Sequence, residues 1–148
     1  MALQTGDKVP HFKSEDDKGN SFDSDEFIGE TPLVVYFYPK NFTPGCTKEA
    51  CDFRDYYDNF KQMGYEVIGI SSDSIQSHQR FKKKYNLPFL FLSDKNGKLR
   101  KLFGVKPKLL GLLPGRETFV IDKEGVIQLR FNSIKASKHI SKALSVIK

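Results

Sequence analysis

The chain has 148 residues, 39% hydrophobic and 28% charged, and no linker or compositional break divides it, so we expect one domain spanning residues 1–148. Its formal net charge of +6 comes largely from lysines spread along the chain, and no nucleic-acid-binding motif accompanies them, so we expect a solvated basic surface and no nucleic-acid partner. No apolar stretch approaches membrane-spanning length and two cysteines are too few for a disulfide framework, which argues against a membrane protein and favours a reducing compartment.

The N-terminal part predicts a β-hairpin followed by a buried strand. Phe12 and Phe22 stand on either side of the turn-forming stretch 16–20, as they would in two short strands joined by a turn. Residues 33–38 are a β-branched and aromatic run that Pro39 closes. We therefore expect a buried strand that ends at a turn.

Cys46 follows this turn and begins the next predicted element. From it the apolar residues recur as Ala50, Phe53, Tyr57 and Phe60, which is the three-and-four spacing of one helical face. A thiol in the first turn of a helix experiences the positive end of the helix dipole and the amide N–H groups that have no partner there. Both favour the thiolate, which is the nucleophilic form of cysteine.

Cys51, the second cysteine, lies five residues farther along the same predicted helix. Helix geometry separates the two Cα atoms by roughly 8.6 Å, which exceeds the limit of roughly 7 Å for a disulfide. The pair therefore cannot bridge while the helix is intact, and a redox role would require the first turns to unwind. Cys51 shares a side with Thr47, Arg54 and Asp58, so we expect it nearer to solvent than the apolar face.

The remaining segments alternate between strand and helix patterns, which predicts parallel strands joined by helical crossovers. In chain order we expect a strand at 65–71, a helix at 74–85, a strand at 89–92, a helix at 97–103, a loop at 106–115, strands at 118–122 and 126–131 around a turn at 123–125, and a helix at 136–147. The fold class is α/β, with a central mixed sheet flanked by helices on both faces and an N-terminal hairpin extension.

This arrangement resembles the thioredoxin fold, and its motifs resemble those of the peroxiredoxins. Pro39-x-x-x-Thr43-x-x-Cys46 is similar to the active-site pattern of that family, and Thr43-Pro44-Gly45-Cys46-Thr47-x-Glu49-x-Cys51 is similar to the peroxiredoxin Q (bacterioferritin comigratory protein) subgroup. The stretch 113–122 resembles the strand that carries the family's active-site arginine, here Arg116. The resemblance covers nearly the whole chain and implies a thiol-dependent peroxidase for hydrogen peroxide and organic hydroperoxides.

The resemblance also implies a role for each cysteine. Cys46 would be the peroxidatic cysteine, which becomes a sulfenic acid, and Cys51 would be the resolving cysteine, which forms an intramolecular disulfide with it. Thioredoxin, or a glutaredoxin-like reductant, would recycle that disulfide. The likeness further implies a monomer, because a resolving cysteine in the same chain removes the need for a partner subunit.

Further residues would support the thiolate. Thr43 would accept a hydrogen bond from a peroxide oxygen or donate one to the thiolate, and Arg116 would bring a fork of charged donors to both. Pro39 has no N–H and would shield the sulfur from water. The amides of Gly45 and Cys46 are candidate donors. Glu49, one turn into the helix, would orient either Arg54 or Arg116.

Each of these residues also has an ordinary structural interpretation. Cys46 lies on an apolar stripe and could be a buried structural thiol, while Cys51 could be a small residue that fills a space on the helix. Arg116 could be an unremarkable charge at the start of a strand, and Thr43 could cap the helix as well as act in the site. These alternatives stay open at this stage.

No metal or organic cofactor is predicted. His11, His78 and His139 are far apart in sequence and lack the spacing of a metal site with either cysteine, so surface or core positions are expected.

Two rival functions remain. A thioredoxin-like disulfide reductase would place its cysteines two residues apart and a proline before the facing strand, and neither is present. A noncatalytic basic binding module would not consume peroxide. The expected location is the cytoplasm, or an organelle stroma if the chain is a trimmed mature form.

Overall fold

Seven strands and five α-helices make up the part of the chain that the computed structural model describes, residues 3–106, 115–133 and 135–147. The strands are β1 (Lys13–Asp16), β2 (Ser21–Asp23), β3 (Leu33–Phe37), β4 (Glu66–Ser71), β5 (Leu90–Ser93), β6 (Glu117–Ile121) and β7 (Ile127–Asn132). The helices are α1 (Pro44–Asp55), α2 (Tyr57–Gln62), α3 (Ile75–Tyr85), α4 (Lys98–Phe103) and α5 (Ala136–Val146), and a short 3-10 helix, η1 (Ser24–Glu26), follows β2.

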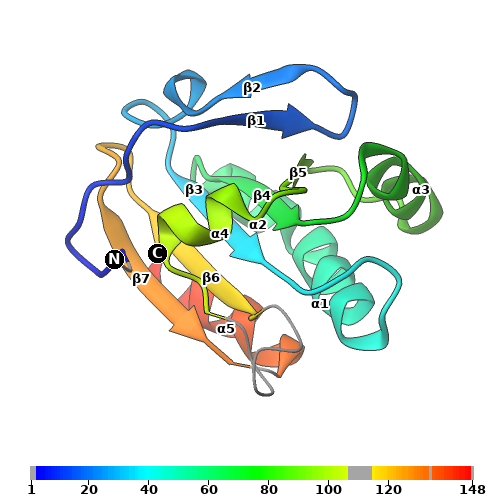
Figure 1. Cartoon of the computed structure of the whole chain (residues 1–148). Helices are drawn as coiled ribbons and strands as arrows, with labels where there is room; N and C mark the ends of the chain where they lie inside the picture. The colour runs from blue at the N-terminus through cyan, green and yellow to red at the C-terminus, as the bar shows by residue number, and fades with distance from the viewer. Residues whose placement is uncertain (1–2, 107–114, 134, 148) are drawn as a thin grey trace.

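The strands form one mixed sheet in the order β2-β1-β5-β4-β3-β6-β7 (Figure 1). β3, β4 and β5 are parallel, and helices connect them, as the strand and helix alternation predicts. β6 pairs antiparallel with β3, and β7 pairs antiparallel with β6. The expected hairpin of β1 and β2 forms one edge of the sheet, where β1 pairs with β5. Both the mixed sheet and the N-terminal hairpin extension are therefore confirmed.

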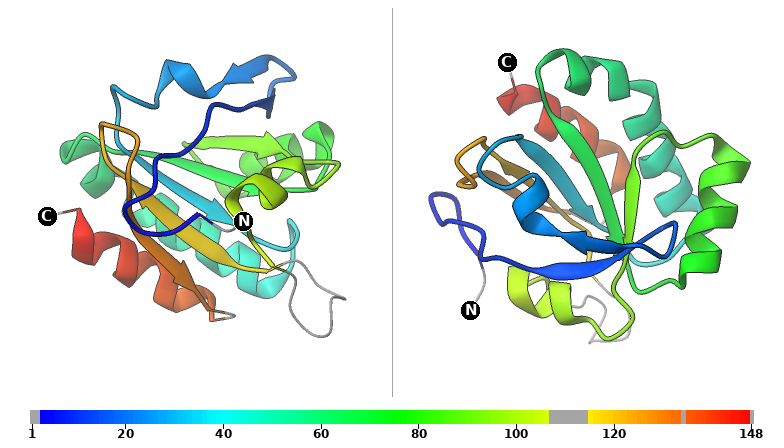
Figure 2. Two further views of the ribbon diagram at one scale, coloured as in Figure 1. Left: turned by 60° about the vertical axis from the view of Figure 1, so that its left-hand side comes forward. Right: turned by 90° about the horizontal axis from the view of Figure 1, so that it is seen from above.

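Alternate side chains of β3 fill two hydrophobic cores, one on each face of the sheet. Val34 and Tyr36 point into the core that α1, α3 and α5 cover. Leu33 and Val35 point into the other core, which α4 and the N-terminal segment cover. Figure 2 shows α1 and α5 on one face of the sheet and α4 on the other. A strand buried on both faces explains why residues 33–37 are apolar without interruption.

The helix that the sequence predicts from Cys46 through Phe60 is interrupted at Tyr56, where α1 ends and α2 begins one residue later. The interruption directs Tyr57 toward the sheet, where its ring packs on Phe89 at 6.1 Å and its hydroxyl donates to Glu66. The apolar face still continues, because the buried Phe60 packs on the α1 side of the same core. The sequence periodicity detects the apolar face that α1 and α2 share, but it does not detect the turn at Tyr56 between them.

Other expected elements agree with the structure to within one or two residues. Ser74 is the N-cap of α3, where its hydroxyl accepts from the amide of Ser77 at 3.1 Å. Gly125 has a φ of +84° in the turn between β6 and β7, as a glycine in that turn would. The expected loop at 106–115 lies mostly outside the described residues. No helix among those described is long and apolar enough to cross a membrane.

Candidate active site

Cys46 lies in the first turn of α1. A turn connects the buried strand β3 to this helix (Figure 1). Pro44 is the first helical residue and Thr43 the N-cap, an arrangement that suits proline because its missing N–H would have no partner there. The thiol is free, and the residue is only 1% exposed. The predicted placement of the sulfur at a helix start is confirmed.

Polar contacts hold the turn that precedes the helix. The amide of Asn41 donates to a carboxylate oxygen of Asp73 at 2.9 Å, and the hydroxyl of Tyr38 donates to the side-chain oxygen of Asn41 at 2.5 Å. The side-chain nitrogen Nδ2 of Asn41 donates to the hydroxyl of Ser77 at 3.1 Å. These bonds tie the turn to β4 and α3. They also support Phe42, whose φ of +66° is unfavourable for a bulky residue.

Thr43 uses its hydroxyl within the turn. Its Oγ1 donates to the carbonyl oxygen of Lys40 at 2.8 Å. The residue occupies the N-cap position, yet its side chain makes no capping hydrogen bond. Of the two roles expected for this hydroxyl, donation to the thiolate therefore competes with an existing bond, whereas acceptance from a peroxide oxygen remains open.

Arg116, immediately before β6, joins Cys46 to Glu49. Its Nη2 atom lies 3.4 Å from the Cys46 sulfur and its Nη1 atom donates to Oε1 of Glu49 at 2.6 Å. Burial opposes the charge of Arg116, but Glu49 and Cys46 outweigh burial and raise the pKa of the guanidinium. Arg116 is thus a fixed positive charge against the sulfur, and the alternative of an ordinary charge at a strand entrance does not fit its 8% exposure.

Glu49 pairs with Arg116, and Arg54 contacts other groups. Arg54 donates to the carbonyl oxygen of Tyr85 at 2.8 Å and to Asp55 at 3.0 Å, so of the two expected partners of Glu49, Arg54 is wrong and Arg116 is the one in contact. Glu49 is only 1% exposed. Burial raises its pKa to about 8, although Arg116 acts in the opposite direction.

Gly45 provides space for Arg116. A Cβ atom at this position would stand 3.1 Å from Nη2 of Arg116, closer than most side-chain contacts allow. Gly45 is not among the glycines with positive φ. The residue is therefore explained by the approach of a guanidinium, a reason that the sequence pattern did not reveal.

A cavity of about 570 Å³, which we call the Arg116 cavity, opens beside this group. It is lined by Pro39, Lys40, Thr43, Gly45, Ser72, Asp73 and Arg116. Four of these lining residues were predicted from the sequence and therefore surround one space, namely Pro39, Thr43, Gly45 and Arg116. Sequence analysis missed Ser72 and Asp73, although both follow the carboxyl end of β4, the end of a parallel strand where ligand sites usually form.

Cys51 lies on α1 in a half-buried position, and its thiol is free. Its exposure fits the expectation that it faces solvent more than Ala50, which is 1% exposed. Both cysteines lie on the one continuous helix α1, whose geometry holds their Cα atoms too far apart for a disulfide.

Two buried histidines border the site, although nothing in the sequence had assigned either of them to it. His78 lies on α3, and its Nδ1 is 3.0 Å from the amide nitrogen of Asn41. His139 lies on α5, with Nδ1 2.8 Å from Thr118 Oγ1 and 3.7 Å from Oε2 of Glu49. Burial lowers the pKa of His139 to about 4. Its position next to Ile140 on the apolar face of α5 was the one sequence feature that could have indicated its burial.

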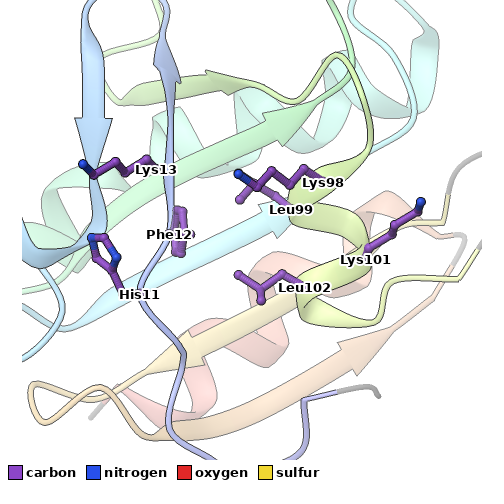
Figure 3. Close-up of a pocket in the computed structure, with 7 residues that line it drawn as sticks. All are labelled: His11, Phe12, Lys13, Lys98, Leu99, Lys101 and Leu102. Atoms are coloured by element: carbon purple, nitrogen blue, oxygen red, sulfur yellow. The ribbon is translucent and has the colours of Figure 1, made fainter.

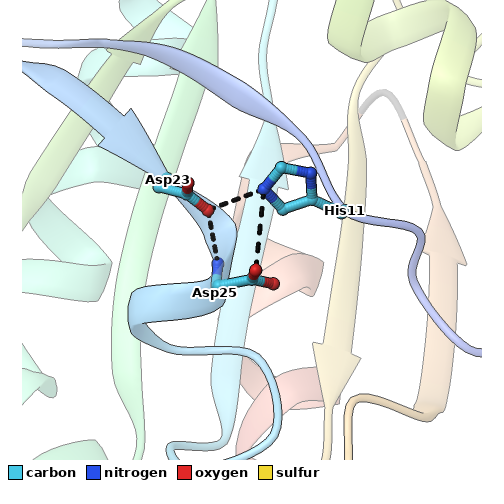
Figure 4. Close-up of side chains that lie close together, drawn as sticks. All are labelled: His11, Asp23 and Asp25. Atoms are coloured by element: carbon cyan, nitrogen blue, oxygen red, sulfur yellow. Dashed lines mark hydrogen bonds and ion pairs between the residues drawn. The ribbon is translucent and has the colours of Figure 1, made fainter.

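His11 lies away from these groups, beside two aspartates (Figure 4). Its Nε2 is 2.7 Å from Asp23 and 3.8 Å from Asp25. These are the described residues that come close enough to share a metal ion. All three are open to solvent to a substantial degree, and Asp23 already accepts hydrogen bonds from the Asp25 amide and from His11. They form an ordinary surface cluster, in which Asp23 is the N-cap of η1.

A second hollow of about 570 Å³ lies between the N-terminal strand and α4 (Figure 3). Phe12, Leu99 and Leu102 contribute its apolar surface. Although Lys13 and Lys101 line it as well, Figure 3 shows their amino groups directed away from the space between the two elements. Neither cysteine lines this hollow, so it adds nothing to the thiol chemistry.

Comparison with known proteins gives a consistent result. Residues 5–130 match the model of the AhpC/TSA family. The sequence is 51% identical to chloroplastic peroxiredoxin Q of Sedum lineare over 96% of this chain and 76% of that protein, and 48% identical to chloroplastic peroxiredoxin Q of Arabidopsis thaliana over 99% and 68%. Among solved structures, the peroxidoxin BcpB of Mycobacterium tuberculosis superposes with a TM-score of 0.89 at 36% identity, covering 98% of this chain and 96% of that one. Peroxiredoxin Q of Xanthomonas campestris gives 0.84 at 30% identity, covering 92% and 89%.

Proposed function

The chain belongs to the AhpC/TSA family as a thiol peroxidase of the peroxiredoxin Q subgroup, and we propose that it reduces hydrogen peroxide and organic hydroperoxides through Cys46 and Cys51. The observation that carries the proposal is the contact of 3.4 Å between Nη2 of Arg116 and the sulfur of Cys46 at the start of α1. A helix start and a guanidinium at one sulfur both favour the thiolate.

In the first step the Cys46 thiolate attacks one oxygen of the peroxide. An S–O bond forms as the O–O bond breaks, the sulfur gives up two electrons, and the second oxygen leaves as hydroxide or alkoxide that takes up a proton. The product is the Cys46 sulfenic acid together with water or an alcohol. This step needs a positive group near the oxygen that gains charge, and Arg116 supplies one.

The other residues of the Arg116 cavity have supporting roles in this proposal. Thr43 accepts a hydrogen bond from the bound peroxide, since its own proton is directed to Lys40. The amides of Gly45 and Cys46 are the candidate donors at the helix start. Pro39 lines the cavity and presents no N–H to compete for the sulfur.

In the second step the thiol of Cys51 attacks the sulfenic sulfur. An S–S bond forms, the S–O bond breaks, and the oxygen leaves as water after taking up a proton. The intact helix keeps the two residues apart, so its first turns must unwind before the disulfide closes. A reduced thioredoxin, or a glutaredoxin-like protein, then returns two electrons by thiol–disulfide exchange.

Alternative interpretations explain the site less well. A structural thiol would not need a buried guanidinium at 3.4 Å, because burying a charge is costly unless something requires it. A thioredoxin-like reductase would need cysteines two residues apart, whereas Cys46 and Cys51 are five apart. A basic binding module would have no use for the Glu49–Arg116 pair.

The test is peroxide consumption by matched serine variants. Cys46→Ser should abolish the reaction, because the hydroxyl is not an effective nucleophile toward peroxide. Cys51→Ser should consume one equivalent of peroxide and then stop, with a sulfenic acid trapped at Cys46. A Cys46→Ser protein that retains turnover with a thioredoxin system would refute the proposal.

We expect no metal, haem, flavin or nicotinamide to be required, because the thiolate supplies both electrons. We also expect a monomer, one domain over residues 1–148, and a location in the cytoplasm or in an organelle stroma. Full turnover after treatment with a chelator, and sedimentation as a single chain at micromolar concentration, are the measurements that check the first two.

A further inference from the structure

One positive charge serves two acids in the buried site. Arg116 donates to Glu49 at 2.6 Å and to the Cys46 sulfur at 3.4 Å. Cys46 and Glu49 are each 1% exposed, and Arg116 is 8% exposed. If both acids were ionised, a buried negative charge would remain without compensation, which is strongly unfavourable. The charge of Arg116 can fully compensate only one of the two acids, which favours retention of a proton on the other.

The groups around this trio among the described residues do not supply a second cation for Glu49. Tyr36, on β3, and Tyr38, just after it, are buried, and burial raises the pKa of both phenols, which stay neutral. Asp52, on α1, adds negative charge and forms an ion pair with Lys48 at 2.8 Å. None of these groups favours an ionised Glu49.

Two further arginines near the site are engaged elsewhere. Arg100, from α4, donates to the carbonyl oxygen of Tyr38 at 2.7 Å, and its charge interacts with Cys46. It therefore favours ionisation of the sulfur and not of the carboxyl group. Arg130 donates to Glu117 at 2.9 Å and accounts for that carboxylate.

His139 adds no positive charge beside Glu49, and its one acceptor nitrogen already accepts from Thr118. Its Nε2 lies 2.7 Å from the carbonyl oxygen of Ser133, which can only accept, so this nitrogen carries the proton. Burial lowers the pKa of His139 to about 4, so near neutral pH the imidazole is uncharged and Nδ1 is an acceptor. Thr118 donates to it at 2.8 Å.

The remaining oxygen of Glu49 faces this acceptor. Oε2 is buried, has no hydrogen-bond partner among the described residues, and lies 3.7 Å from Nδ1 of His139. An ionised carboxylate would leave a buried negative charge on this oxygen without a donor. A protonated one removes that charge, while Oε1 still accepts from Arg116.

We propose that Glu49 carries a proton on Oε2 while Cys46 is a thiolate. This inference rests on the proposed function, which requires that thiolate. Glu49 then positions Arg116 as a neutral acceptor and leaves the guanidinium charge to the sulfur and the peroxide.

Infrared spectroscopy of the reduced protein tests the proton directly, without peroxide. The carbonyl stretch of a protonated carboxylic acid should be present near neutral pH and missing from Glu49→Gln. Glu117→Gln is the matched control, because Glu117 is equally buried but paired with Arg130, and its loss should leave the band in place. Absence of the band from the parent protein would overturn the inference and leave the peroxidase proposal standing.

The pH profile of the peroxide reaction gives a second test. Because the pKa of Glu49 is about 8, the parent rate constant should fall as pH rises through that value and Arg116 becomes neutralised by the carboxylate. Glu49→Gln keeps an acceptor for Arg116 and has no group that ionises, so it should be slowed by only about threefold and lack the alkaline fall. Glu49→Met has no acceptor and should be slowed by about tenfold or more at every pH. Equal slowing in both variants would contradict the inference.

Discussion

Gly45 and Arg116 are fitted to one another, because a Cβ atom on Gly45 would stand 3.1 Å from Nη2 of Arg116. Gly45→Ala should displace the guanidinium from the Cys46 sulfur by a few tenths of an ångström. We expect the second-order rate constant for peroxide to fall by about tenfold, since small displacements of catalytic groups are costly. Unfolding free energy should change by less than about 1 kcal/mol. Stopped-flow kinetics and urea denaturation measure the two effects.

A double-mutant cycle shows whether the Gly45 effect acts through Arg116. If it does, Gly45→Ala should cost almost nothing further when Arg116 is already alanine. Additive losses would mean that the methyl group obstructs the Arg116 cavity itself.

Arg116→Ala should slow the attack on peroxide by roughly 100-fold or more, the usual scale for removing a charged donor from a reacting centre. The fold should be affected less, because the buried Glu49 can remain protonated without its partner. Arg54→Ala is the control, since Arg54 donates to the Tyr85 carbonyl oxygen on the other side of α1. An unchanged rate constant in Arg116→Ala would remove this arginine from the mechanism.

His139 should make stability depend on pH on the acid side. Burial lowers its pKa from 6.5 to about 4, so the unfolded chain binds a proton between these values and the native protein does not. Stability is therefore present above 6.5 and lost as pH falls toward 4, by an amount on the order of 3 kcal/mol. His139→Phe should flatten this part of the curve, whatever its effect on the plateau. His11→Gln removes an exposed histidine and serves as the comparison; an equal change of slope in both would contradict the assignment.

Glu49 should act in the opposite sense. Its pKa is raised from 4.5 to about 8, so the native protein holds the proton more tightly than the unfolded chain does. The protonated form contributes stability that is complete below 4.5 and lost as pH rises through 8. Glu49→Gln should gain stability relative to the parent between about pH 5 and about pH 8. Urea midpoints that move in parallel for both proteins across this range would exclude a buried titrating carboxyl group here.

Sequence patterns predict those parts of the fold that depend on residues close together in the chain. The uninterrupted apolar run of β3 indicates a strand buried on both faces, and the alternation with helices indicates parallel pairing. Local patterns say nothing of the pairing between β1 and β5, which joins residues far apart in the sequence. They also missed the break at Tyr56, because Phe53 and Phe60 remain on one face across it.

Prediction of the site divides in a similar way. Cys46 could be placed because a helix start after a buried strand is a local feature with a chemical consequence. The choice between Arg54 and Arg116 as partner of Glu49 could not be made, because it depends on a contact between residues 67 positions apart in the sequence. His139 contacts the site from α5, and nothing within its own segment indicates a carboxyl group 3.7 Å away.

Oxidation should unfold the start of α1, because Cys46 and Cys51 are too far apart on an intact helix to bond. The structure adds two reasons for the opening to begin at this end. Phe42 has a φ of +66°, which stores strain that unwinding releases, and its side chain is already 42% exposed. Phe53, fully buried, is the larger loss, so the disulfide form should be less stable and more easily digested here.

Hydrogen exchange of the two redox forms tests this opening segment by segment. Amides from Cys46 to Arg54 should exchange faster in the disulfide form, while those of α3 and of the central strand β4 should keep their protection. Cys51→Ser is the control, because it reaches the sulfenic acid without closing a disulfide and should leave most of α1 protected. Unwinding would also carry the disulfide outward, where a reduced thioredoxin can attack it, so the same motion would connect peroxide reduction to recycling. Equal protection of the α1 amides in the reduced and disulfide forms would show that the bond closes by some movement other than unfolding of the helix.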